Sequence, residues 1–190
     1  HERLSRKPSE DRWETAMKEM PLSQWRHYPS LAVGGKNLLR SLRLSQEGAG
    51  DIQPLLRAMP LAERAYAALT QRVVKGSDFE HSGAAVRLLI EVARNHHAVI
   101  QAGLGPLDIP PPETIFKEAI TNAAVNKDEE DLFARSLTSL AEHYSSCGER
   151  ENAKDYALQA LVECGNLKIQ NPELMTALRE IFEANKDTLD

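Results

Sequence analysis

The sequence is poor in aromatic residues and contains no long apolar run. Aromatic side chains make up 5% of its 190 residues, whereas β-sheets are enriched in aromatic and β-branched residues. Alanine and leucine are abundant instead, and both favour helices. We therefore expect an all-α fold. No apolar run approaches the roughly 18 residues that a membrane-spanning helix needs, so we expect no membrane association.

Cysteine is also scarce. Cys147 and Cys164 are the only two, and they lie inside helical patterns rather than in the dense spacing of a disulfide framework. We expect both to be buried thiols in a reducing compartment, so we predict an intracellular protein, cytoplasmic or nuclear. The chain begins with His1 rather than Met, and we expect it to be a piece of a longer protein.

Motifs for metal binding and catalysis are missing. The sequence has no His-Glu-x-x-His, Cys-x-x-Cys or Asp-rich calcium loop. The neighbours His96 and His97 would point about 100° apart on a helix, so they cannot bind one metal from one face. We expect His96 to be a partly buried, hydrogen-bonded residue. We predict no catalytic residue, metal site or cofactor, and hence no enzyme.

Charge is distributed unevenly along the chain. Residues 1–50 contain 9 Lys and Arg against 6 Asp and Glu, and residues 51–190 contain 14 against 22. An acidic body repels phosphate backbones. This disfavours nucleic-acid binding outside the first fifty residues.

Proline and glycine divide the N-terminal half into segments with helical periodicity. The predicted helices cover residues 8–20, 30–44, 51–59, 61–75 and 79–102. Pro60 is expected to end one helix and open the next, and Gly76 to end the latter. Ser77 or Asp78 is expected to cap the longest helix. Gly34 and Gly35 are expected to weaken the helix that contains them.

The segment richest in glycine and proline is residues 103–112, where we predict a hinge. It would separate an N-terminal helical subdomain, residues 1–105, from a second one, residues 112–190; one continuous domain is the alternative. The helices predicted after it cover residues 113–125, 129–146, 150–164 and 172–186.

Residues 134–167 have the spacing of two close-packed antiparallel helices. Gly148 falls at the turn between the two predicted helices. The spacing on the first helix is set by Leu137, Leu140, Ala141 and Tyr144, and on the second by Ala153, Ala157, Ala160 and Leu161. This pattern resembles a tetratricopeptide repeat, a unit of 34 residues. It departs from the family at Leu137, where a Trp is usual, at Ala157, where a large aromatic is usual, and at Gly165, where a proline is usual.

The resemblance implies an array of antiparallel helix hairpins, with a less regular helical N-terminal part. Leu174, Met175 and Leu178 continue the spacing and would belong to a terminal capping helix. The family binds peptides or helices of partner proteins on its inner helices. The corresponding positions here are Arg135, Thr138, Glu142 and Ser145. Glu142 stands where members that bind acidic tails have Asn, which implies a neutral or basic, partly apolar ligand.

Two further groups near the N-terminus are candidates for partner binding. Lys36, Arg40 and Arg43 recur at helical spacing, which is typical of a solvated face or of a docking patch for an acidic segment or phosphate. Trp13 and Trp25 either pack onto the chain's own helices, the favoured interpretation, or anchor a partner.

These observations lead to two hypotheses for the function. The first is a non-catalytic scaffold or adaptor domain that binds a peptide or helix of another protein. The alternative is an adaptor that binds nucleic acid or phosphate through the basic N-terminal segment.

Overall fold

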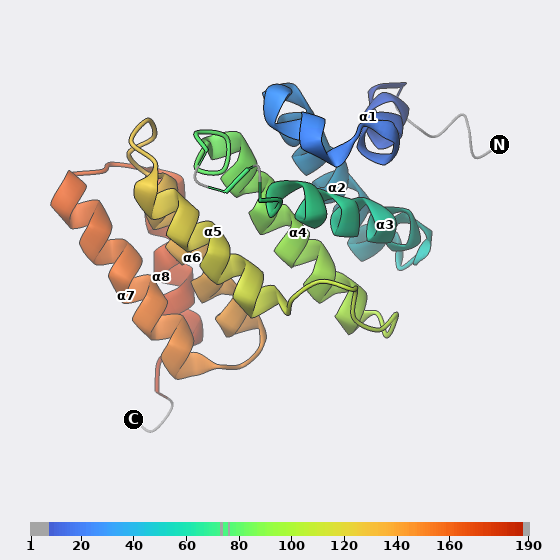
Figure 1. Ribbon diagram of the computed structural model, residues 1–190. Helices are drawn as coiled ribbons and strands as arrows, with labels where there is room; N and C mark the ends of the chain where they lie inside the picture. Colours follow the sequence, from blue (N-terminus) through green and yellow to red (C-terminus); the bar gives the residue numbers. More distant parts are fainter. Residues whose placement is uncertain (1–7, 73, 76, 188–190) are drawn as a thin grey trace. The chain divides into compact units, whose positions relative to one another are not determined.

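The computed structural model describes residues 8–72, 74–75 and 77–187. These residues form eight α-helices and one 3-10 helix, with no strand among them, which confirms the all-α prediction (Figure 1). No helix within these ranges is long and apolar enough to cross a membrane. The chain divides into an N-terminal unit, His1–Ile115, and a C-terminal unit, Phe116–Asp190. The predicted boundaries at residues 105 and 112 lie before this division.

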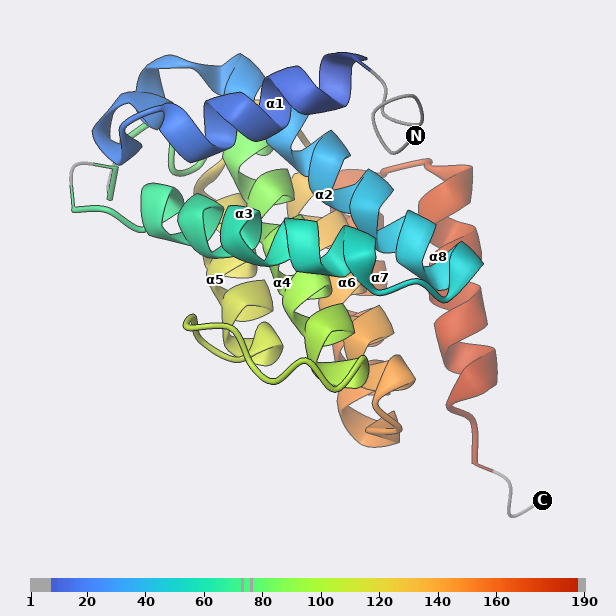
Figure 2. The ribbon, with the colours of Figure 1, turned by 90° about the vertical axis from the view of Figure 1, so that its right-hand side faces the viewer.

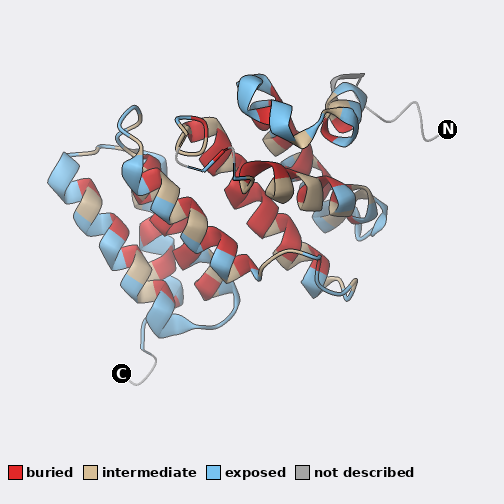
Figure 3. Ribbon diagram, viewed as in Figure 1, coloured by how far each residue is buried: buried red, intermediate tan, exposed pale blue. Residues whose placement is uncertain are grey.

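The N-terminal unit is built around one buried helix. Its elements are α1 (Pro8–Glu19), η2 (Leu22–His27), α2 (Pro29–Ala49), α3 (Gln53–Leu69) and α4 (Gly83–Gln101), followed by the start of α5 (Pro112–Val125). Helix α4 packs against α2 and α3, and α1 packs against the same two helices (Figure 2). Most of α4 is buried (Figure 3), so it forms the core of this unit.

The predicted break at Pro60 is wrong, because α3 continues through it. A proline inside a helix leaves the carbonyl four residues earlier without its helical donor. That carbonyl belongs to Leu56, and both Leu56 and Pro60 are exposed. Water can therefore satisfy the carbonyl on the solvent side, and the helix need not end.

The predicted start of α4 is also wrong. Its N-cap is Ser82, whose Oγ accepts a hydrogen bond from the backbone N–H of Ala85 at 3.2 Å. Ser77 and Asp78 lie in the preceding turns. The predicted stop at Gly76 lies outside the described residues, and α3 ends at Leu69.

The two glycines of α2 are contact points between helices. A Cβ atom added to Gly34 would lie 2.2 Å from the Trp13 ring, and one added to Gly35 would lie 3.2 Å from Cε of Met17. Glycine therefore lets α1 approach α2 more closely than any other residue would allow. The prediction that Gly34 and Gly35 weaken this helix did not take the contact with α1 into account. Helix α2 runs unbroken to Ala49.

The C-terminal unit contains α5 from Phe116 onward, α6 (Leu132–Ser146), α7 (Arg150–Leu167) and α8 (Pro172–Ala184). Helices α6 and α7 pack along each other, and α8 packs on both. Most residues of the predicted spacing are buried, namely Leu137, Leu140, Ala141, Tyr144, Ala153, Ala157 and Ala160. Two residues of the spacing are exposed: Gly148 at the turn, and Leu161, which lies on the second helix as predicted but has 41% of its surface exposed.

Candidate functional site

A groove of about 400 Å³ lies between α6 and α8 of the C-terminal unit. Its lining residues are Glu142, Ser145 and Ser146 from α6, and Ala177, Glu180, Ile181 and Ala184 from α8. The carboxylates of Glu142 and Glu180 come from opposite sides, and both residues are exposed. Ile181 is buried and supplies the apolar floor. The groove therefore combines a small apolar floor with an acidic rim.

Two asparagines hold α8 against α6. Asn171 caps α8, because its Oδ1 accepts from the N–H of Leu174 at 3.1 Å, while its Nδ2 donates to Asp131 at 3.3 Å. At the other end, Nδ2 of Asn185 donates to Oγ of Ser145 at 2.9 Å. Asn185 is 2% exposed, and Ser145 is half-buried. The two bonds join α8 to α6 at both ends of α8.

Of the four positions implied by the repeat resemblance, the structure brings Glu142 and Ser145 to the groove. Thr138 is buried, and its hydroxyl donates to the carbonyl of Ala134 at 2.8 Å. Its prediction as a ligand contact is therefore wrong. The side chain bonds to its own helix, which a small hydroxyl residue can do at any buried helical position.

Arg135 lies away from the groove's lining and pairs with Asp131, with Nε and Oδ2 2.6 Å apart. The ion pair of Arg135 is therefore made with its own helix start and not in the groove. Partial burial acts to raise the pKa of Asp131, but the hydrogen bond and charge of Arg135 outweigh it, and the pKa is lowered. Arg135 thus stabilises the charged form of Asp131 at the start of α6.

The basic stripe of α2 is interrupted. Arg43 is 8% exposed and forms an ion pair with Glu91 of α4. Glu91 also accepts from Nη1 of Arg94 at 3.0 Å. The prediction that Arg43 belongs to a docking patch is wrong, because α4 covers this end of the α2 face. Lys36 is half-buried and Arg40 is exposed.

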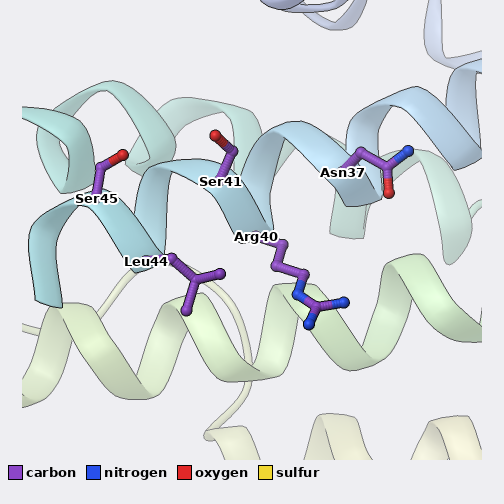
Figure 4. Close-up of a pocket in the computed structure, with 5 residues that line it drawn as sticks. All are labelled: Asn37, Arg40, Ser41, Leu44 and Ser45. Carbon is purple, nitrogen blue, oxygen red and sulfur yellow. The ribbon is translucent and has the colours of Figure 1, made fainter. Parts of the chain in front are cut away.

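A second hollow, of about 450 Å³, runs along α2 beside Arg40. It is lined by Asn37, Arg40, Ser41, Leu44 and Ser45, and Arg40 is the one cation among these described residues. In Figure 4, Arg40 and Leu44 extend from one side of α2, and Ser41 and Ser45 from the other. The hydroxyl of Ser41 donates to Glu10 at 2.8 Å. A single cation is a weak anion site.

The two tryptophans pack inside the N-terminal unit. Trp25 is fully buried, and its Nε1 donates to the carbonyl of Met20 at 3.3 Å. The alternative role as a partner anchor is therefore wrong for Trp25. The ring of Trp13 covers Gly34 of α2, as the favoured interpretation expects.

His96 is buried and hydrogen-bonded. Its Nε2 accepts from the N–H of Leu107, and its Nδ1 lies 3.0 Å from the carbonyl of Pro110. The ring therefore carries its proton on Nδ1. Burial lowers the pKa of His96, more than the bond to Pro110 raises it. These two bonds fasten the predicted hinge, residues 103–112, to α4.

The cysteines differ in exposure. Cys164 is buried, as predicted, and burial raises the pKa of its thiol. Cys147 is exposed, so its predicted burial is wrong. It caps the C-terminal end of α6, where the chain turns toward α7 at the surface.

Sequence reasoning missed Glu91 and Asn185, and it identified Asn171 only as the residue that opens α8. Glu91 did have a signal, because it is a lone charge inside the apolar run from Leu88 to Val92, and a buried charge needs a partner. Asn185 had no comparable signal. Comparison of the chain with protein-family models, curated proteins and solved structures finds no match.

Proposed function

We propose that this protein is a non-catalytic adaptor that binds a basic segment of a partner protein in the groove between α6 and α8. The observation that supports this proposal is the pair of exposed carboxylates, Glu142 and Glu180, on opposite sides of an apolar floor. The proposed role requires no catalytic residue or cofactor. It also agrees with the resemblance of α6 and α7 to one tetratricopeptide repeat, with α8 as its cap.

The chemistry of the groove selects its ligand by charge and size. Lysine and arginine carry a long apolar stem and a terminal charge. A stem can lie over Ile181 while the charge approaches Glu142 or Glu180. An acidic tail would meet repulsion at both carboxylates. We therefore propose a basic segment with small apolar residues, taken up as a peptide or a helix.

A binding titration tests this proposal. The probe is a short fluorescent peptide of alternating lysine and leucine, with a matched peptide that has glutamate in place of lysine. At about 0.15 M salt, we expect the basic peptide to bind and the acidic peptide to remain free in fluorescence anisotropy.

The control variants distinguish binding in the groove from a general attraction of the basic peptide to the acidic protein. The double variant Glu142→Lys, Glu180→Lys should weaken binding of the basic peptide roughly tenfold or more, because two attractions become repulsions. The double variant Glu130→Lys, Glu173→Lys makes the same charge change at exposed positions outside the lining. Equal loss of binding in both variants would exclude the groove as the site.

The structure offers less support for an adaptor that binds nucleic acid or phosphate. Burial of Arg43 leaves Lys36 and Arg40 as the accessible part of the stripe. Phosphate binding weakens steeply with salt. A steep salt dependence of binding to a single-stranded oligonucleotide, lost in Arg40→Ala, would favour this alternative.

A further inference from the structure

Two side chains of metal-binding type lie together at the C-terminal end of α6. Nε2 of His143 lies 3.8 Å from Sγ of Cys147. The two residues are four positions apart, so their side chains share one side of the helix. Cys147 is exposed and His143 is half-buried. An ion in solution can therefore reach the thiol, with the imidazole beside it.

The distance between the two atoms fits a shared metal ion. Zinc binds thiolate sulfur at about 2.3 Å and imidazole nitrogen at about 2.0–2.1 Å. With tetrahedral angles, such bonds set the sulfur and the nitrogen about 3.6 Å apart. The observed separation of 3.8 Å is close to this value. A small rotation of the exposed Cys147 side chain would let both atoms bind one ion.

The imidazole is held in position by the core of the C-terminal unit. The centroid of the His143 ring lies 5.0 Å from that of Phe116 and 6.1 Å from that of Tyr144. Phe116 and Tyr144 are both 2% exposed, so neither ring can move far. A ligand that is oriented before binding loses less conformational entropy when the metal binds. The His143–Cys147 pair is therefore partly preorganised.

The electrostatic surroundings also favour a cation. Cys147 is the C-cap of α6, and the C-terminal end of a helix carries a partial negative charge. The nearest charged residues along the chain are Glu142, Glu149 and Arg150, all exposed. Carboxylates outnumber the guanidinium group among them. Neither the helix end nor its flanking charges would repel a metal ion.

We propose that His143 and Cys147 bind one divalent transition-metal ion of the zinc type. Thiolate and imidazole ligands suit such ions, whereas magnesium and calcium prefer oxygen. On binding, the thiol releases its proton to solvent, and the sulfur and Nε2 each donate one electron pair to the ion. Water would complete a tetrahedral site. With two protein ligands, the ion should exchange with solution and should not be needed for folding.

The proposed metal site goes beyond the proposed function and does not depend on it. Neither His143 nor Cys147 lines the groove between α6 and α8. The site also differs from the sequence-based expectation of no metal site. That expectation depended on motifs with two histidines or two cysteines, and a mixed pair four residues apart belongs to none of them.

A titration of the reduced protein with Co²⁺, a spectroscopic substitute for zinc, tests the site. We expect an ultraviolet charge-transfer band, which arises when a thiolate binds Co²⁺, and we expect Zn²⁺ to remove it by displacement. Cys147→Ser should abolish the band. Cys164→Ala is the control, because it removes the buried thiol of the same unit and should leave the band unchanged.

Histidine variants test whether the two side chains act together. His143→Gln should weaken Co²⁺ binding roughly tenfold or more, since loss of a residue that merely orients a ligand already costs about 10–100-fold. His27→Gln, at an exposed histidine of η2, should leave binding unchanged. Circular dichroism checks that the variants keep their helix content. A thiolate band that persists in Cys147→Ser, or equal affinities of His143→Gln and His27→Gln, would overturn the proposal.

A second measurement uses the unaltered chain. Zn²⁺ should slow the alkylation of Cys147 by iodoacetamide, as followed by mass spectrometry of the labelled peptides, because a metal-bound thiolate is a poorer nucleophile. Mg²⁺ at the same concentration should leave the rate unchanged, since it does not favour sulfur ligands. Equal alkylation rates with the two metals would show that the pair binds no zinc-type ion.

Discussion

The two units bring their helices together by different means. In the N-terminal unit, charged side chains cross the helix contacts. Arg43 of α2 meets Glu91 of α4, and Nη2 of Arg57 on α3 lies 2.9 Å from Oε2 of Glu14 on α1. Burial acts to raise the pKa of Glu14, but Arg57 and Lys18 outweigh it, and the pKa is lowered. These contacts specify which residues must face each other.

In the C-terminal unit, the main helix contact depends on size. Ala153, Ala157 and Ala160 of α7 are fully buried where α7 packs along α6. The hydroxyl groups of Ser136, Thr138 and Ser139 on α6 donate to carbonyls of their own helix, as when Ser136 donates to the carbonyl of Leu132 at 2.8 Å. No charge need be paired across such a contact. The N-terminal unit should therefore be sensitive to loss of a charge, and the C-terminal unit to added volume.

The largest effect is expected from Arg43→Ala. Breaking a buried ion pair by removing one partner costs about 3–5 kcal/mol, and we expect a loss toward the lower end of this range, because Glu91 keeps its contact with Arg94. Urea unfolding followed by circular dichroism measures this loss. Arg40→Ala, one helical turn earlier and exposed, should change stability by less than about 0.5 kcal/mol. Equal effects would show that Arg43 is not held in a buried pair.

The size-dependent contact is tested by Ala160→Arg, with Ala153→Arg as a second variant. A long cation at a close helix contact combines overpacking with an unpaired charge, so we expect a loss of about 3 kcal/mol. The neighbouring Gln159 is exposed, and Gln159→Arg should be nearly neutral. An unchanged melting temperature for Ala160→Arg would contradict the observed packing of α7.

A smaller loss, about 2 kcal/mol, is expected from Gly34→Ala, because the new methyl group would displace the Trp13 ring. Gly48→Ala is the control in the same helix, since nothing lies within 4 Å of a Cβ there. Alanine is the better helix former, so Gly48→Ala should stabilise by up to about 1 kcal/mol. Thermal unfolding would show shifts of opposite sign; shifts of the same sign would refute the close contact.

The smallest effect concerns pH. Because the pKa of His96 is lowered in the folded state, its contribution to stability is present above the ordinary value of about 6.5 and is lost as the pH falls through the folded pKa. His97, whose pKa burial also lowers, contributes in the same sense. The lowered pKa values of Glu14 and Asp131 act only at more acidic pH.

We expect His96→Gln to flatten the dependence of unfolding free energy on pH below about 6.5, beyond any flattening by His97→Gln. Protonated His96 could not accept the N–H of Leu107.

Non-specific protease at low dose should cut residues 103–112 faster in His96→Gln at neutral pH. An unchanged cleavage rate would show that His96 does not hold this segment.

The sequence predicted most helix ends of the C-terminal half well, because a proline begins α5 and α8 and Gly148 separates α6 from α7. The predicted end of α7 at residue 164 is too early, since Gly165 lies inside that helix. The prediction failed at Pro60, since a single helix pattern does not show which carbonyls face water. It failed at Arg43 for a related reason. Lys36, Arg40 and Arg43 do share one face of α2, but α4 covers only one end of that face.

The candidate groove was predictable in part. The resemblance to a tetratricopeptide repeat named Glu142 and Ser145 as ligand positions, and both line the groove. The contribution of α8 did not follow, since it depends on how α8 packs on α6. A lone asparagine such as Asn185 looks like an ordinary helix end in the sequence, and only the fold brings it to Ser145.

The placement of the tryptophans makes them a local probe. Both tryptophans of the chain, Trp13 and Trp25, belong to the N-terminal unit, and Trp25 is fully buried. Selectively excited tryptophan emission therefore follows the unfolding of that unit alone, whereas far-ultraviolet circular dichroism sums the helices of both units. Coincident transitions would mean that the chain unfolds as one cooperative system. Separate transitions would give each unit its own melting temperature.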